Sequence, residues 1–269
     1  MTNAAFDEVA QDYDDRFSNQ PITQHLRHHI HAKAAAYLPS QARILEIGCG
    51  TGVDAAHFAA KGHFVMATDP STEMLQVARN RIGPDHGHFA IWNADAPPPQ
   101  VLTEHGPYDM VFSNFGAVNC ICDLGGFANR IAPLMRPGTV VFIVIINRWC
   151  LSEFILGLAL MNRKNLTRRW RKHGAAKLED GSTLAVQLPS VKDLTKAFSK
   201  DFELKETAPI GVFLPPSELY QSFQKRPKLL RIAYWLDQKI GRVWPFSKLG
   251  DHSLLVFQRT ETCPAATRA

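Results

Sequence analysis

From Arg43 onward, short apolar runs typical of buried strands alternate along the chain with amphipathic segments typical of helices. Before them, the spacing of apolar residues predicts one helix over 22–37. Alternation of this kind predicts right-handed β-α-β units, which form a parallel sheet covered by helices on both faces. The predicted strands are 43–48, 63–68, 87–92, 108–114, 139–146, 202–210 and 252–259, and the predicted helices of this part are 52–61, 71–82, 124–135 and 191–199.

The alternation is interrupted twice, over 148–190 and over 214–250. We expect both stretches to be helical cap insertions into one domain of residues 1–269, placed near the end of the sheet where ligands bind. The most apolar run, 140–160, contains Asn147, Arg148 and Glu153. These polar residues favour a strand followed by a helix over a membrane span.

The composition limits the class of protein and its compartment. Apolar residues make up 45% and charged residues 20% of the 269 residues, which is typical of a globular chain. The net charge of +5 favours anionic partners, but it is small for a dedicated nucleic-acid-binding protein. The five cysteines have no spacing that indicates a disulfide framework or a zinc site, and the acidic first residues lack the pattern of a signal peptide. We therefore expect a cytoplasmic protein.

The stretch "LEIGCGTG" places Gly48, Gly50 and Gly52 between a predicted strand and a predicted helix. Bare backbone and helix N-terminal amides then face whatever ligand lies at the end of the strand. A dinucleotide-binding turn requires G-x-G-x-x-G, and the third glycine of that pattern would stand where Val53 is. Asp69, at the end of the next strand, is suited to accept both hydroxyl groups of a ribose.

Together, "LEIGCGTG" and the following "ATDPSTEMLQVAR" resemble the first motifs of the class I S-adenosylmethionine (SAM) dependent methyltransferases. The resemblance covers 43–147 well, the later strands moderately and the two insertions poorly. It implies an α/β fold: a Rossmann-like, doubly wound and mostly parallel sheet of seven strands. The last strand, 252–259, would be antiparallel, and S-adenosylhomocysteine would be the product of the cofactor.

The resemblance also implies which residues bind SAM. The three glycines would lie along its methionine part, Glu46 would hold the amino group and Asp69 the ribose. Asp69 could instead cap the helix that starts at Ser71, and Met74 could be ordinary core. The complete set of expected cofactor-binding residues is Glu46, Gly48, Gly50, Gly52, Asp69, Pro70, Met74, Asp95, Ala96 and Asn114, with Asp95 of "WNADA" on the adenine amino group and Ala94 and Ala96 flanking the ring.

Methyl transfer depends mainly on alignment of the nucleophile, and a base is needed only if the nucleophile arrives protonated. An antiparallel last strand begins at the open end of the sheet, which makes His252 a candidate base and Asp251 its orienting carboxylate. His252 could instead form only a hydrogen bond within the hinge of a cap. Tyr13 resembles an N-terminal tyrosine of small-molecule methyltransferases, in which the segment here numbered 1–40 folds over the cofactor.

Substrate contacts are expected from Asn119, Asn147 and Arg148, at or just beyond strand ends, although each asparagine could simply cap a turn. The histidines of the first helix, His25, His28, His29 and His31, have no acidic or cysteine partner nearby. We therefore expect a solvated helix face there and no metal site.

The preferred function is methyl transfer to a small hydrophobic or anionic metabolite, with oxygen as the favoured acceptor atom. Both insertions mix apolar with basic residues. This composition would suit a hydrophobic pocket and contact with a membrane surface or lipid. Methylation of RNA is an alternative, because the run 163–177 combines Lys and Arg with Trp170. Nucleic acid is otherwise not expected, since no separate RNA-binding module is visible. A SAM-binding regulatory protein without catalysis is the third hypothesis.

Overall fold

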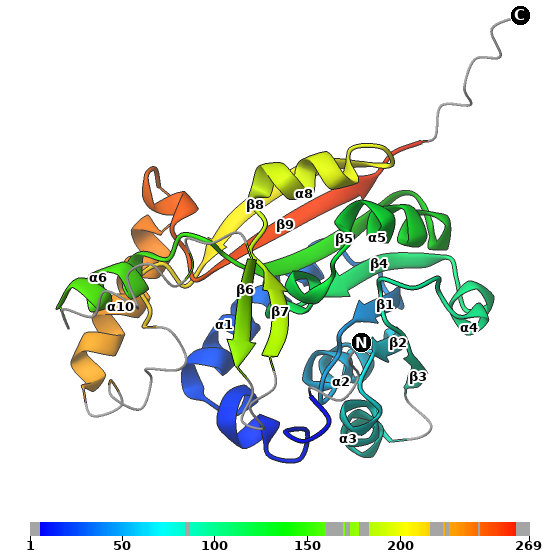
Figure 1. Ribbon diagram of the computed structural model, residues 1–269, viewed down its shortest axis with the longest axis horizontal. Helices are drawn as coiled ribbons and strands as arrows, with labels where there is room; N and C mark the ends of the chain where they lie inside the picture. Colours follow the sequence, from blue (N-terminus) through cyan, green and yellow to red (C-terminus); the bar gives the residue numbers. More distant parts are fainter. Residues whose placement is uncertain are drawn as a thin grey trace, which may run out of the picture.

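The computed structural model of the chain describes residues 6–83, 87–159, 169, 173–177, 183–215, 223, 226–241 and 243–261. Its centre is a seven-stranded sheet with the strand order β3-β2-β1-β4-β5-β9-β8 (Figure 1). The strands are β1 (Arg43–Ile47), β2 (Phe64–Asp69), β3 (His88–Ile91), β4 (Tyr108–Ser113), β5 (Met135–Ile146), β8 (Phe202–Ile210) and β9 (His252–Arg259). β1 to β5 are parallel, and β9 is antiparallel to both β5 and β8. The expected mostly parallel sheet with an antiparallel last strand is confirmed.

Alternate residues of each strand serve the two faces of the sheet, because the side-chain period of a strand is two. Ile44 of β1 belongs to the core under one set of helices and Leu45 to the core under the other. The first face is covered by α1 (Pro21–Ala35), α2 (Val53–Ala60) and α3 (Thr72–Ile82); the second by α4 (Gln100–Glu104), α5 (Leu124–Ile131) and α8 (Val191–Phe198). Both faces are thus buried, as the uninterrupted apolar runs predict.

The predicted boundaries fail most clearly between α5 and β5. The sequence predicts a helix to 135 and a strand from 139, whereas α5 ends at Ile131 and the 3₁₀ turn η4 (Ala132–Leu134) leads directly into β5 at Met135. Pro133 explains the early end, since proline lacks the amide hydrogen that a continuing helix needs. A second 3₁₀ turn, η3 (Ala117–Cys120), follows β4.

The expected insertions contain helices, as predicted for caps and for the segment after β5, and also a strand pair that the apolar spacing did not predict. After β5 come α6 (Leu151–Ala159) and a separate antiparallel pair, β6 (His173–Lys177) with β7 (Thr183–Gln187). After β8 come α10 (Pro227–Ile240) and the 3₁₀ turn η6 (Phe246–Lys248). α6 and α10 lie at the same end of the molecule in Figure 1. Of the helices in the described part, none is both long enough and apolar enough to cross a bilayer.

Candidate functional site

A cavity of about 280 Å³ opens at the carboxyl ends of β1, β2 and β4, the edge where ligands of parallel sheets bind. Its floor is the glycine turn after β1, and its walls come from α1, the N-terminal segment and the segments after β2, β3, β4 and β5. The lining residues are Phe6, Tyr13, Phe17, Ser18, Arg27, Ile47, Gly48, Cys49, Gly50, Thr51, Val53, Asp54, Asp69, Pro70, Met74, Trp92, Asn93, Ala94, Asn114, Phe115, Gly116, Ala117, Cys120, Ile121, Ile146 and Val186.

The glycine turn is shaped by two different requirements. Gly48 has a φ of +66°, and a Cβ there would lie 2.4 Å from the Cβ of Ala117. Gly50 also has a positive φ, +53°, but a Cβ there would meet open space. Packing against Ala117 therefore excludes any side chain at position 48. At position 50 the glycine leaves the backbone exposed to a ligand. Gly52, which is absent from the lining, faces Ala78 of α3.

Asp69 ends β2 with its carboxylate at the cavity, and two backbone amides orient it. The N–H of Gly50 donates to Oδ2 and the N–H of Ser71 to Oδ1, each over 2.9 Å. Burial raises the pKa of Asp69 to about 6, although both hydrogen bonds oppose the shift. The cap of α3 comes instead from Ser71, whose Oγ accepts the N–H of Met74. Asp69 thus connects the glycine turn to α3 and still presents a carboxylate to a ligand.

A buried ionic cluster borders the cavity beside the glycine turn. Asp54 of α2 accepts from Arg27 Nη1 at 2.5 Å, from His31 Nε2 at 2.5 Å and from Asn114 Nδ2 at 3.1 Å. Burial alone would raise the pKa of Asp54, but Arg27 and His31 outweigh it and hold the pKa well below its usual range. Arg27 and Asp54 both line the cavity, and no motif in the sequence marked either of them.

Glu46 lies behind this cluster and is absent from the cavity lining. It shares the β1 face of Ile44, is 2% exposed, and its Oε2 has no hydrogen-bond partner. Burial and the neighbouring Asp54 raise its pKa well above the usual value. The structure therefore does not bring Glu46 to the place where the sequence expected it to hold an amino group.

The N-terminal segment forms one wall of the cavity with Tyr13 and Phe17, whose rings lie 5.5 Å apart. The segment includes the π-helical turn η2 (Asp14–Ser18). It is held to the glycine turn because Thr51 Oγ1 donates to Asp14 over 2.6 Å and Arg81 forms an ion pair with the same carboxylate. Burial raises the pKa of Tyr13 to about 12, so its phenol is a hydrogen-bond donor at neutral pH rather than a base.

Pro70, Met74, Trp92, Asn93 and Ala94 form the wall between β2 and β3. Asp95 and Ala96 are absent from this wall. The Asp95 carboxylate accepts the backbone N–H groups of Cys122 and Asp123 at 2.9–3.0 Å. Ala96 is exposed. The Asp95 side chain thus points to the start of α5, and neither residue lines the cavity.

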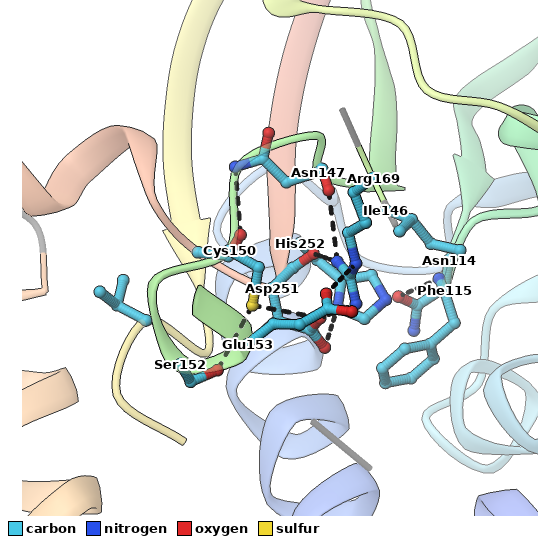
Figure 2. A network of polar contacts seen from close by, with 12 residues as sticks. Asn114, Phe115, Ile146, Asn147, Cys150, Ser152, Glu153, Arg169, Asp251 and His252 are labelled. Atoms are coloured by element: carbon cyan, nitrogen blue, oxygen red, sulfur yellow. Dashed lines mark hydrogen bonds and ion pairs between the residues drawn. The ribbon is translucent and has the colours of Figure 1, made fainter. Parts of the chain in front are cut away.

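A second polar network lies where β5 ends and β9 begins (Figure 2). Its centre is Arg169, whose Nε lies 2.5 Å from Glu153 and whose Nη2 lies 2.7 Å from Asp251 Oδ1. Arg169 Nη1 also donates to the backbone oxygens of Asn147 and Asp251. Burial would raise the pKa of Asp251, but His252 and Arg169 hold it well below its usual range. The arrangement keeps Asp251 ionised beside His252.

His252 is 8% exposed, and its Nδ1 lies 3.1 Å from Oδ2 of Asp251. The carboxylate lies on the Nδ1 side of the ring, which leaves Nε2 on the opposite side. The ring does not line the cavity; it meets the edge of Phe115, which does, at 5.4 Å between centroids. Phe115 has a φ of +46°, and Arg27 lies over its ring at 4.9 Å. Phe115 therefore separates the His252–Asp251 pair from the cavity.

The expected substrate residues are engaged elsewhere. The amide of Asn119, fully buried, joins β5 to β7 through Ile146 and the backbone oxygen of Gln187. Asn147 Nδ2 binds the backbone oxygens of Trp149, Lys248 and Gly250. Neither residue lines the cavity, and Arg148, half-buried, does not either. Both asparagines join distant chain segments, which is neither the expected substrate contact nor the turn cap that the sequence left open.

The expectation of a solvated histidine face on α1 is wrong for two of its members. His31 is 8% exposed and bonded to Asp54, and the ring of His25 packs on Tyr234 of α10 at 4.2 Å. The strand-to-helix pattern could not reveal this, because the partners come from α2 and from the second insertion.

A sheet of this order, with a glycine turn after β1 and an acidic residue at the end of β2 at one cavity, is typical of the class I methyltransferase fold. Residues 44–138 match the model of a family described as a methyltransferase domain. A solved SAM-dependent methyltransferase from Clostridium acetobutylicum aligns with a TM-score of 0.60 over 95% of this chain and 99% of that one, at 13% identity. That likeness shows the fold.

Curated relatives agree with this assignment. A ubiquinone biosynthesis O-methyltransferase from Chelativorans sp. is 29% identical over 132 residues, 49% of this chain and 49% of the relative. A demethylmenaquinone methyltransferase from Clavibacter sepedonicus is 30% identical over 139 residues, 51% of this chain and 55% of the relative. The chain spans about half the length of these relatives. Residues 44–138 thus match a methyltransferase-domain family, and the chain shares the fold of solved SAM-dependent methyltransferases.

Proposed function

We propose that this chain transfers the methyl group of SAM to the hydroxyl oxygen of a small hydrophobic or anionic molecule. The observation that carries the proposal is the shared cavity of the bare Gly50 backbone and the Asp69 carboxylate. When bound, SAM supplies a methyl group on a sulfonium, which an aligned oxygen nucleophile can displace.

Different residues of the cavity suit different parts of this cofactor. Asp69 would accept the ribose hydroxyls, and Met74 and Pro70 would contact the adenine. Asn93 and Ala94 take the adenine edge in place of Asp95 and Ala96. Arg27 would attract the methionine carboxylate and Asp54 its ammonium group, a task expected earlier of Glu46. The side chains of Tyr13 and Asn114 complete the walls, and Gly48 and Gly52 set the shape of the turn.

The acceptor region is the part of the cavity between η3 and the end of β5. Its walls are apolar there, with Phe17, Phe115, Ile121, Ile146 and Val186. Such walls suit a hydrophobic acceptor. The names of the two curated relatives refer to ubiquinone and to demethylmenaquinone, and both are hydrophobic quinones. We therefore propose a hydroxylated aromatic ring as the acceptor.

We assign to His252 the role of base and to Asp251 that of orienting carboxylate. A ring hydroxyl arrives protonated, so a base within reach accelerates the transfer. Since Phe115 stands between His252 and the cavity, its ring must turn aside for the acceptor to reach Nε2. The positive φ of Phe115 supports such a role, because strained backbone is typical of functional sites.

Methylation of RNA has less support. Most of the basic run 163–177, Trp170 included, lies outside the described residues. Arg169 belongs to this run, and its guanidinium is turned inward to Glu153 and Asp251. The cytosol remains our proposal for the compartment, which the free thiols of Cys49, Cys120, Cys122 and Cys150 suit.

The test is transfer of radiolabelled methyl from SAM to separate pools of hydroxylated aromatic molecules, lipids and RNA. We expect label in the aromatic pool, retained at high salt. Label in RNA that disappears with salt would replace the proposal with the RNA hypothesis. Measurable SAM binding without label in any pool would leave the regulatory hypothesis.

A further inference from the structure

The exposed apolar side chains of this protein are gathered in two segments. Among the described residues, ten large hydrophobic side chains are exposed, and nine of them belong to residues 149–158 or 229–244. Ile91, on β3, is the exception. The nine are Trp149, Phe154, Ile155, Leu158, Leu229, Ile232, Trp235, Val243 and Trp244. Such a concentration marks an interaction surface rather than scattered surface residues.

Both segments lie at one end of the molecule. α6 and α10 are at the same side of Figure 1, and the N–H of Leu151 donates to the backbone oxygen of Leu249 over 2.9 Å. On α10, Leu230 and Ala233 are buried, whereas Lys228, Ile232, Trp235 and Lys239 are exposed. Spacings of four, three and four residues put this exposed set on one stripe of the helix. We call the nine apolar residues and the exposed bases around them the α6–α10 surface.

The charges of this region are sorted by sign. In the described part of 226–251, five bases are exposed: Arg226, Lys228, Arg231, Lys239 and Lys248. The acids of the same region are turned inward, since Asp237 accepts the N–H groups of Val212 and Phe213 and Asp251 pairs with Arg169. Glu153 of α6 likewise pairs with Arg169. Among the described residues of the two segments, positive charge thus surrounds the exposed apolar side chains, and no exposed acid lies between them.

We propose that the α6–α10 surface docks on the anionic face of a lipid bilayer. Exposed Trp149, Trp235 and Trp244 suit the boundary between lipid headgroups and acyl chains, where indole rings are enriched. The bases would lie against anionic headgroups, as on amphipathic helices that bind membrane surfaces. A second copy of the chain fits less well, because a two-fold interface would bring the same positive charges face to face.

Docking here would place the apolar end of the cavity near the bilayer. Asn147, one residue after the cavity residue Ile146, binds backbone oxygens on both sides of the surface, at Trp149 and at Lys248. The proposal goes beyond the methyl transfer of the preceding subsection and does not depend on it, because docking can be measured without SAM.

The experiment is co-sedimentation of the full chain with phosphatidylcholine vesicles, with and without phosphatidylglycerol. We expect binding to the vesicles that contain phosphatidylglycerol. Replacement of Arg231 and Lys239 by Gln should weaken it by about fivefold for each charge removed. The charge control is a variant with Lys192→Gln and Lys200→Gln, exposed lysines of the α8 region, which should bind like the wild type.

A second pair of variants tests the apolar ridge. Trp235→Ser should weaken vesicle binding by about tenfold, while Ile91→Ser, which removes an exposed apolar side chain elsewhere, should not. The thermal midpoint and SAM affinity of every variant should match the wild type, which distinguishes loss of docking from loss of the fold. Equal binding to both kinds of vesicle, no binding, or a dimer that Trp235→Ser converts to a monomer would each overturn the proposal.

Discussion

Asp69 is the residue whose ionisation should be visible in cofactor binding. Burial raises its pKa to about 6, so the carboxylate is ionised above that pH and protonated below it. An ionised carboxylate accepts two ribose hydroxyls, whereas a protonated one loses acceptor capacity. SAM affinity, measured by calorimetry, should therefore be constant above pH about 6 and fall as the pH is lowered through it.

The variant that isolates this effect is Asp69→Asn. It should weaken SAM by about tenfold at pH 8 and remove the titration near pH 6, because hydrogen bonds to charged groups are worth about 1.5–3 kcal/mol. Glu73→Gln, an exposed acid of α3, is the matched control and should leave both unchanged. If SAM affinity still changes near pH 6 in Asp69→Asn, the titrating group is a different one. The proposed contact between Asp69 and the ribose would then be wrong.

His252 should matter for turnover and not for cofactor affinity. His252→Ala should lower kcat by about a hundredfold, since a positioned base contributes at least that much, and leave the Kd for SAM unchanged. His28→Ala on the exposed face of α1 is the control. Normal turnover of His252→Ala at every pH would assign His252 to the packing against Phe115 alone.

Residues were predictable from the sequence where they follow a strand end directly. Asp69, Pro70, Asn114 and the glycines Gly48 and Gly50 lie on the cavity because parallel strands bring their carboxyl ends to one edge. Glu46 is inside its strand, and the pleat turns it to the α1 face behind the cavity. Arg27 lies on α1, far away in the chain, and its place depends on packing that no local pattern encodes.

At the scale of elements, the N-terminal segment should control how long the cofactor stays bound. Asp14 joins the segment to Thr51 and Arg81, next to the glycine turn. Asp14→Asn removes the ion pair, which is partly screened because Arg81 is one-third exposed. In this variant, SAM should dissociate about three- to tenfold faster than from the wild type, as measured by stopped flow.

The control for this element is Asp12→Asn, whose exposed pair with Arg16 stays within the segment. It should not change the dissociation rate. If SAM dissociates equally fast from Asp14→Asn and Asp12→Asn, the N-terminal segment lines the site but does not control the release of SAM.

The elements of the sheet were predictable because each carries a buried strand pattern or an amphipathic helix pattern. β8 (Phe202–Ile210) and β9 (His252–Arg259) match their predicted ranges. The pair β6–β7 was missed, since strands such as "HGAAK" have small residues without the apolar alternation of a half-buried strand. The second insertion was expected to be helical, but the bounds of α10 were not predicted, because its exposed face carries Ile232 and Trp235 and the apolar residues therefore do not follow a clear helical period.

At the scale of the whole molecule, charge and apolar area are distributed for different tasks. The net charge of +5 is small, yet the exposed bases of 226–251 stand together around the α6–α10 surface. The ions at the cavity and behind it, such as Arg27 with Asp54 and Arg169 with Asp251, are buried and paired. A membrane surface and a hydrophobic acceptor would thus meet the chain at the same end.

The central claim is that the glycine turn and Asp69 hold the adenosyl group of SAM in one cavity. A crystal structure with S-adenosylhomocysteine tests it most directly. The account predicts the ribose hydroxyls on the Asp69 carboxylate, the adenine against Met74 and Ala94, and the amino acid end beside Arg27. An empty cavity at saturating ligand, or the ligand bound elsewhere on the chain, would contradict it.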